Sequence, residues 1–366
     1  MKKTISILLI LALTVVLFAG CAGTPVIYYS DCTCPTGGHT VPPVIDYSDC
    51  TCPTGSHTVT PDYIPTEGAL KTGLAIVTKM SKADDANQVE YDVTVVAVTV
   101  DDNGVIQDCI IDSVGAKADI NEKGEITTDT AAAVLTKNEL GDSYGMKAYG
   151  NAKYEWYEQA AALANYAKGK TVAELKQGAV NEAGKAADAD LASTATIFLG
   201  GYVGAIEEAV KNAQHLGAQA GDELKLAVVC SLGSSANATA EEAGTAQLDC
   251  DVTALTVKDG KITSCVIDAV QAKASFDITG AITTELPANV QTKNQLGEGY
   301  GMKAWSNAKY EWNEQAASFA AYVTGKTAAE VAGIAVAEGK PSDVDLSATV
   351  TIAIGGFQAL IAKAMQ

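Results

Sequence analysis

Basic residues are scarce in this sequence, and their scarcity excludes two classes of partner. Lysine and arginine together number 25 of 366 residues, against 44 aspartates and glutamates, which gives a formal net charge of −19 at pH 7. Nucleic acids and anionic membrane surfaces are bound through basic protein surfaces. We therefore expect no nucleic-acid partner. The acidic balance does not by itself identify a substrate.

Histidine is rarer still, with three in the chain. Only His215 lies outside the N-terminal segment, and it has no counterpart in the second copy of the internal repeat described below. A Ser-His-Asp or Cys-His set is therefore not available in both copies. The glutamate pairs Glu155/Glu158 and Glu311/Glu314 have a three-residue spacing that is typical of a solvated helix face, so they do not indicate a glycosidase.

Long apolar runs are confined to the N-terminus. Residues 5–18 are apolar but short for a membrane span, and two lysines precede them. The small residues before Cys21 resemble the lipobox of bacterial lipoproteins, although Phe18 stands where leucine is usual. The resemblance implies a signal peptide over 1–20 and acylation of Cys21. The protein would then be anchored by lipid on the outer face of a bacterial cell membrane. The alternative is a plain secretory signal with an incidental cysteine.

A tether rich in proline, threonine and glycine is expected over residues 21–66, and it contains a short repeat that starts at Pro25 and again at Pro43. Each copy has a Cys-x-Cys pair followed by a histidine. These residues are Cys32, Cys34, His39, Cys50, Cys52 and His57. They supply the thiols and imidazoles of a tetrahedral zinc site, but their spacing is not that of zinc ribbons. Disulfides between the copies, or a plain spacer, are the alternatives, and we favour these in an exported protein.

The rest of the chain contains two copies of one unit. Residues 136–148 match 292–304, and residues 151–161 match 307–317. The period is far longer than that of solenoid repeats, so the pattern predicts duplicated domains rather than a repeat array. We place the domains at 67–217 and 218–366, with the boundary in a stretch rich in glycine and alanine.

Both copies have the same order of expected elements. Apolar and β-branched runs separated by Asn-Gly or Asp-Gly predict an antiparallel sheet. These runs are 74–80, 89–100 and 105–112, and then 226–232, 248–257 and 261–268, with a further strand pair around Gly124 and Gly280. The period then becomes helical from Trp156 and Trp312 onwards, which predicts an α+β fold class with helices packed on each sheet.

Four cysteines belong to the expected strands. Cys109 and Cys265 occupy equivalent positions in the two copies, so we expect them to be buried thiols. Cys230 and Cys250 occur only in the second copy, on neighbouring strands, where they can pair.

One stretch near the end of each copy is suited to hold a phosphate. The stretch from Asp190 to Thr196 returns, altered, from Asp345 to Thr351, and each threonine is followed by a glycine pair and a helix. Helix N-terminal N–H groups lack partners, and the helix dipole favours negative charge there. The alternative is that Asp190 or Ser193 only caps a helix or a turn.

This stretch resembles the flavinylation motif Asp-x-x-Ser/Thr-Gly-Ala-Thr of the FMN-binding domain family. The family includes the C subunit of the sodium-pumping NADH:quinone oxidoreductase, where a Mg-dependent flavin transferase joins FMN to the last threonine through a phosphoester. The first copy matches at Asp190, Ser193, Ala195 and Thr196, with Thr194 in place of glycine. The second keeps Asp345 and Thr351, with Ala348, Thr349 and Val350 in place of the other residues. The block from Thr-Lys-Asn to Glu-Trp-x-Glu-Gln also looks like the repeats of flavinylated surface lipoproteins.

The resemblance implies covalent FMN at Thr196 and Thr351, with the two aspartates helping the transferase to place Mg and activate the hydroxyl. It makes the Tyr-Gly-Met turns candidates to lie against the isoalloxazine ring, through Tyr144, Met146, Tyr300 and Met302. Trp156 and Trp312 are further candidates, although their helical stripes favour a place in the core.

The resemblance further implies an electron carrier rather than a stand-alone enzyme. A membrane quinol or NADH oxidoreductase would donate electrons to its flavins, which would pass them to extracellular acceptors. One alternative is a non-redox binding lipoprotein on a degenerate FMN-binding scaffold. Another is a metal-handling lipoprotein centred on the tether.

Overall fold

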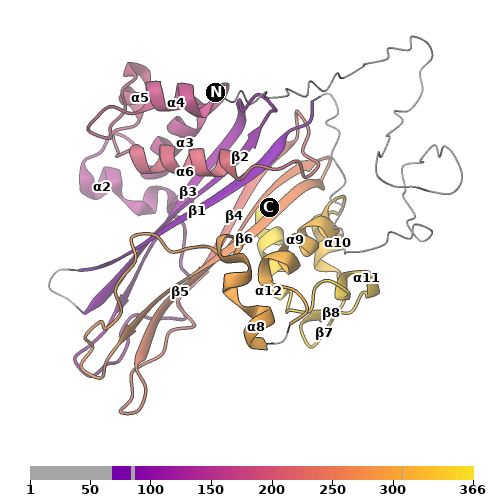
Figure 1. Ribbon diagram of the computed structural model, residues 1–366. Coiled ribbons are helices and arrows are strands. Elements are labelled where there is room, and N and C mark those ends of the chain that lie inside the picture. Colours follow the sequence, from indigo (N-terminus) through magenta and orange to yellow (C-terminus); the bar gives the residue numbers. More distant parts are fainter. Residues whose placement is uncertain (1–67, 84–86, 307) are drawn as a thin grey trace, which may run out of the picture. The chain divides into compact units, whose positions relative to one another are not determined.

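A computed structural model describes residues 68–83, 87–306 and 308–366, which all belong to one compact unit spanning Tyr63–Gln366 (Figure 1). The signal peptide, the lipidation site Cys21 and the whole tether lie outside the described residues. The tether residues concerned are Cys32, Cys34, His39, Cys50, Cys52 and His57. Among the described helices, none has the length and apolar character needed to cross a membrane.

The two repeats have nearly the same element order. The first contains β1 (Lys71–Lys82), β2 (Gln88–Val100), β3 (Ile106–Asp119), α1 (Lys137–Leu140), η1 (Gly141–Tyr144), α2 (Met146–Gly150), α3 (Trp156–Ala167), α4 (Val172–Ala179), α5 (Ala189–Thr194) and α6 (Gly200–Lys211). The second contains β4 (Glu223–Ser231), β5 (Gly244–Lys258), β6 (Lys261–Phe276), α7 (Lys293–Leu296), η2 (Gly297–Tyr300), α8 (Met302–Ser306), α9 (Trp312–Val323), α10 (Ala328–Ala332), β7 (Val336–Ala337), β8 (Lys340–Pro341), α11 (Val344–Ser347) and α12 (Gly355–Ala364).

Each repeat has an antiparallel sheet of three strands, ordered β1-β2-β3 and β4-β5-β6. The predicted strands and the α+β fold class are therefore confirmed. The turn between β5 and β6 is Asp259-Gly260, where φ is 51° and 74°. Two successive positive φ angles suit the twist of a tight hairpin, which explains the Asp-Gly signal.

The further strand pair expected around Gly124 and Gly280 is wrong, because each copy has only an isolated bridge there, Ile120 to Ile126 and Phe276 to Ile282. Both backbone and side-chain bonds close the first of these turns. Asn121 N donates to the Glu125 carbonyl at 2.9 Å. The Asn121 side-chain oxygen accepts from the backbone N–H groups of Lys123 and Glu125 at 2.9 and 3.0 Å. These local bonds stabilise a turn without a continuous strand ladder.

The two sheets share a hydrophobic core. One face of each sheet contributes to a single buried cluster, which includes Ile76 and Val95 from the first repeat and Leu248 and Phe276 from the second. The other face of each sheet is covered by the helices of its own repeat. Helices α3 and α6 thus lie on the first sheet, and α9 and α12 on the second (Figure 1). The predicted boundary near residue 217 therefore separates two repeats that pack against each other. The sheet face of each repeat that its own helices do not cover is buried against the sheet of the other repeat.

The cysteines follow their predicted arrangement. Cys230 and Cys250 stand opposite each other on β4 and β5 and form a disulfide. Cys109 and Cys265 are free and buried, and burial raises the pKa of each thiol to about 12. These two thiols are therefore protonated and unreactive at neutral pH.

The disulfide should stabilise the unit by restricting its unfolded state. A cross-link with a sequence separation of 20 residues is worth about 3 kcal/mol in the loop-entropy model. We expect Cys230→Ser with Cys250→Ser to lower the free energy of unfolding by about that amount, as measured by denaturant titration. Reductant should weaken the wild-type unit and leave the double variant unchanged. A reductant effect of equal size in both proteins would contradict this assignment.

Candidate functional site

Thr196 and Thr351 are exposed and lie between a short helix and the last helix of their repeat. Thr196 follows α5 and precedes Gly200, the first residue of α6. Thr351 precedes Gly355, the first residue of α12, by the same interval. Both hydroxyl-bearing residues thus occupy a loop ahead of a long helix, as the sequence predicts.

The short helices are capped by aspartates that the sequence motif did not include. The Asp188 carboxylate accepts from the N–H groups of Asp190 and Leu191 at 2.9 and 3.0 Å, and Asp343 caps α11 in the same way. Asp190 is exposed, and the Ser193 hydroxyl donates to the Asp190 carbonyl at 2.7 Å. Asp190 and Ser193 therefore cap neither helix, because the N-cap of α5 is Asp188 and that of α6 is Leu199, which makes no side-chain cap bond. The Ser193 hydroxyl bonds within its own helical turn.

A buried glutamine holds each threonine. The Gln159 Oε1 atom accepts from Thr196 N at 2.7 Å, from Thr196 Oγ1 at 3.2 Å and from Ile197 N at 3.1 Å. In the second repeat, Gln315 Oε1 accepts from Thr351 N at 2.8 Å and from Thr351 Oγ1 at 3.2 Å. Both glutamines are at most 1% exposed. Neither glutamine was among the predicted site residues, although a glutamine within an apolar helical stripe in both copies is a signal that could have indicated them.

The same glutamines reach the Tyr-Gly-Met turns. Gln159 Nε2 donates to the Tyr154 carbonyl at 2.9 Å and lies 3.9 Å from the sulfur of Met146. Gln315 makes the equivalent contacts, at 3.0 Å and 3.9 Å, with Tyr310 and Met302. Each predicted methionine and its threonine therefore contact one glutamine side chain.

Glu155 and Glu311 are buried, so their placement on a solvated helix face is wrong. Each is 2% exposed. The Glu155 carboxylate accepts from the N–H groups of Met146 and Lys147 at 2.8 and 2.9 Å. These groups open α2, which has no side-chain cap at its own N-cap, Gly145, so Glu155 satisfies donors that would otherwise be unpaired.

The second glutamate of each pair serves a neighbouring lysine. Glu158 pairs with the Lys147 ammonium at 2.8 Å, and this lysine lowers the pKa of the Glu158 carboxyl. Glu314 pairs with Lys303 at the same distance. Neither pair of glutamates is placed for acid–base catalysis. In each pair, one carboxylate accepts hydrogen bonds from a helix N-terminus, and the other forms an ion pair with a lysine.

The predicted tyrosines face a lysine. Lys137 Nζ lies 5.3 Å from the Tyr144 ring centre and 5.2 Å from that of Trp156. Lys293 lies at 5.0 and 4.7 Å from the rings of Tyr300 and Trp312. Both tryptophans are buried, which confirms their expected place in the core. The lysine of each Thr-Lys-Asn motif therefore makes cation–π contacts with a half-exposed tyrosine and a core tryptophan.

The glycine pairs open helices that lack a side-chain cap. The N-cap residues of α6 and α12 are Leu199 and Ile354, and neither makes a side-chain cap hydrogen bond. A Cβ atom on Gly200 or Gly201 would meet nothing within 4 Å, and neither residue has a positive φ. Neither packing nor backbone conformation therefore explains these glycines, which leave the helix N-terminus open.

In the first repeat, a lysine side chain lies beside the threonine. Lys185 Nζ donates to the Thr196 carbonyl at 2.6 Å and lies 4.0 Å above the ring of Phe198, which is 66% exposed. Alanine stands at the position of this phenylalanine in the second repeat, as Ala353. The two threonine sites therefore share a glutamine and an open helix end but differ in their surroundings.

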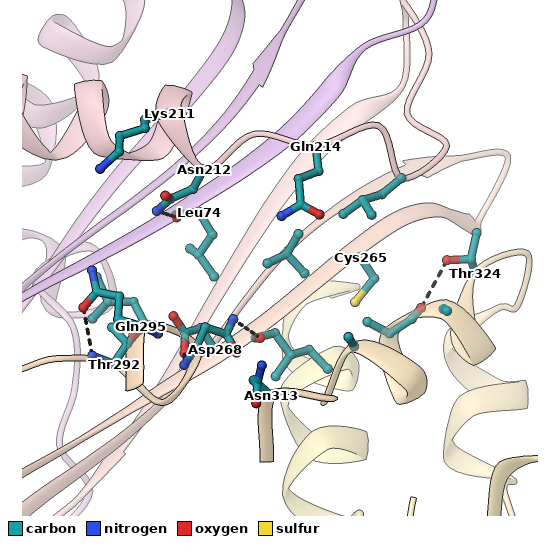
Figure 2. A pocket seen from close by; sticks show the side chains of 18 residues that line it. Leu74, Lys211, Asn212, Gln214, Cys265, Asp268, Thr292, Gln295, Asn313 and Thr324 are labelled. Carbon is teal, nitrogen blue, oxygen red and sulfur yellow. Dashed lines mark hydrogen bonds between the residues drawn. The ribbon is translucent and has the colours of Figure 1, made fainter. Parts of the chain in front are cut away.

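A concavity of about 650 Å³ lies between the repeats, and neither threonine lines it (Figure 2). Leu74 and Asn212 line it from one side, and Asp268 and Asn313 from the other. Asp268 accepts from the N–H groups of Ala269 and Asn294 at 2.7 and 3.0 Å, and burial raises its pKa to about 6. No motif or periodicity in the sequence predicts this pocket.

No group of three or more histidine, cysteine or acidic side chains that could hold a metal ion occurs within residues 68–83, 87–306 and 308–366. Comparisons of the chain with protein-family models, with curated proteins and with solved structures found no match. The chemical interpretation therefore depends on the geometry of the two threonine sites.

The role of Gln159 can be tested by removing its acceptor. Gln159→Leu leaves the Thr196 and Ile197 N–H groups without their partner, so we expect the free energy of unfolding to fall by about 1–3 kcal/mol. Amide hydrogen exchange should accelerate at residues 196 and 197 and stay unchanged at residue 351. Gln315→Leu is the matched control and should give the reverse pattern. Equal acceleration at both sites in either variant would argue against a local role.

The raised pKa of Asp268 predicts a pH-dependent stability. The folded protein binds the Asp268 proton more tightly than the unfolded chain does, so this stabilisation is complete below the ordinary pKa of 3.8 and is lost as pH rises through about 6. We expect Asp268→Asn to be more stable than wild type at pH 8 by about 1–3 kcal/mol, with no difference at pH 3.5. Asp259→Asn, in the exposed hairpin turn, controls for the loss of one negative charge. Denaturant titrations across this range that show a constant difference would contradict the prediction.

Proposed function

We propose that this protein is a lipid-anchored surface flavoprotein in which FMN is joined by phosphoester bonds to Thr196 and Thr351. Each repeat would be an FMN-binding-like unit, held away from the membrane by the tether that follows Cys21. The carrying observation is that, in both repeats, an exposed threonine held by a buried glutamine precedes an open, double-glycine helix N-terminus.

The site chemistry suits a phosphodiester. Helix α6 has 12 residues and α12 has 10, so each presents a full helix dipole at an end with no side-chain cap. The exposed threonine hydroxyl is accessible to a transferase. In the first repeat, the Lys185 ammonium, which lies on the Thr196 carbonyl, adds positive charge beside the site. The glycines leave room for a ribityl chain close to the backbone.

The motif substitutions of the second repeat fall on positions that do not alter the threonine. Val350 is fully buried, as Ala195 is at the equivalent position of the first repeat. Thr349 Oγ1 donates to the Leu346 carbonyl at 3.4 Å. Its equivalent, Thr194, donates to a carbonyl of its own short helix at 3.1 Å. This agreement supports modification of Thr351 as well as Thr196.

Bound FMN would supply the redox chemistry, and the protein would supply attachment and exposure. A membrane quinol or NADH oxidoreductase would reduce the flavins, which would pass electrons to extracellular acceptors. Covalent attachment suits a site outside the cell, where a dissociated cofactor would be lost.

The proposal is tested by co-expressing the full chain with a flavin transferase and measuring intact mass and absorbance. We expect two flavin adducts on the wild type, one on Thr196→Ala, one on Thr351→Ala and none on the double variant. The matched controls Thr194→Ala and Thr349→Ala should keep both adducts, because these hydroxyls bond their own helices. The absence of any adduct would favour a non-redox binding lipoprotein, for which the pocket between the repeats is the candidate site. Adducts that persist in the double variant would overturn the assignment of the flavins to these two threonines.

A further inference from the structure

Two large aromatic side chains stand almost fully in solvent at equivalent positions of the repeats. Tyr149 on α2 is 92% exposed, and Trp305 on α8 is 90% exposed. A single exposed ring is ordinary. Here, however, an exposed ring recurs at the same position in both copies. The residue changes from tyrosine to tryptophan, but an aromatic ring is kept, which indicates a function for that ring.

Each ring lies beside the glycine of its Tyr-Gly-Met turn. A Cβ atom on Gly145 would lie 2.6 Å from a Tyr149 ring carbon, and one on Gly301 would lie 2.5 Å from Trp305 Cδ1. Both glycines have a left-handed conformation, with φ of 83° and 85°. The left-handed backbone therefore requires the glycine of each Tyr-Gly-Met turn, and the ring lies beside it. Tyrosine and tryptophan side chains have only two χ angles, so they lose little conformational entropy when a ligand stacks on them.

The helix that carries each ring is fixed to the threonine site. Helix α2 begins at Met146, whose sulfur lies against Gln159, the residue that holds Thr196. Helix α8 has the same relation to Gln315 and Thr351 through Met302. At a rise of about 1.5 Å per residue, Tyr149 is roughly one helical turn from Met146. The helix that carries the exposed ring and the threonine therefore contact the same glutamine in each repeat.

We propose that Tyr149 and Trp305 are the stacking platforms for the isoalloxazine rings carried by Thr196 and Thr351. This inference rests on the proposed function and assigns the ring-binding role to residues outside the Tyr-Gly-Met turns themselves. A flat heteroaromatic ring is the ligand that an exposed aromatic face recognises. Tyr144 and Tyr300 are less suited to it, because their rings already contact Lys137 and Lys293.

The test uses the full chain with a single flavin. In the Thr196→Ala background, the adduct is at Thr351, and stacking on Trp305 should quench flavin fluorescence through electron transfer in the excited state. We expect Trp305→Ala to raise the emission per flavin several-fold, Trp305→Tyr to keep most of the quenching and Tyr149→Ala, the matched control, to change nothing. In the Thr351→Ala background, Tyr149→Ala should raise the emission and Trp305→Ala should not.

Intact mass separates the two ways in which the inference can fail. If Trp305→Ala carries its adduct in full and its emission per flavin equals that of the parent, the stacking role is overturned and the proposed function stands. An equal rise in emission for Trp305→Ala and Tyr149→Ala within one background would also overturn it, since the effect would then not be local. If no variant carries an adduct, both the proposed function and the stacking role fail.

Discussion

The hydrogen bonds of one buried glutamine amide hold each candidate site together. An amide that is removed from water must find partners for both its oxygen and its nitrogen, because an unpaired buried polar group is costly. Gln159 meets this requirement with the threonine loop on one side and the Tyr154 carbonyl on the other. The threonine loop, 37 residues further along the chain, therefore keeps a fixed relation to α3. The hydrogen bonds from the loop to Gln159, a buried residue of α3, hold the loop in place. The exposed threonine is therefore attached to a rigid helix.

This constraint explains why the two copies agree most in the block that ends at Gln159 and Gln315. Its residues make directional hydrogen bonds, such as the Thr136 capping box with Glu139 and the bonds from Glu155 to α2. Directional bonds require particular donors and acceptors. Core positions tolerate exchange more readily, because burial is not directional. Leu163, for example, is replaced by Phe319 at the equivalent buried place.

Duplication also shaped the architecture. Each sheet has two apolar faces, and only one is covered by the helices of its own repeat. The second face of each sheet is buried against the other repeat, which makes the two copies one compact unit. The threonine sites belong to the outer helical layers, away from this shared core. Under the proposed function, the protein would thus carry two flavins on one body, each with its own glutamine, glycine pair and aromatic platform.

Local chemistry in the sequence was sufficient for the α+β class, the main strands and helices, the Cys230–Cys250 disulfide and the position of the threonines. Apolar and β-branched runs, turn residues and helical periodicity involve a few neighbouring residues, so they can be recognised without the fold. The tertiary structure alone decided that Glu155 is buried, that Asp188 is the cap, that the sheets pack on each other and that Gln159 holds Thr196. That last bond joins residues 37 apart. The burial and partners of a polar side chain depend on which distant segments pack around it, and no local pattern specifies those contacts.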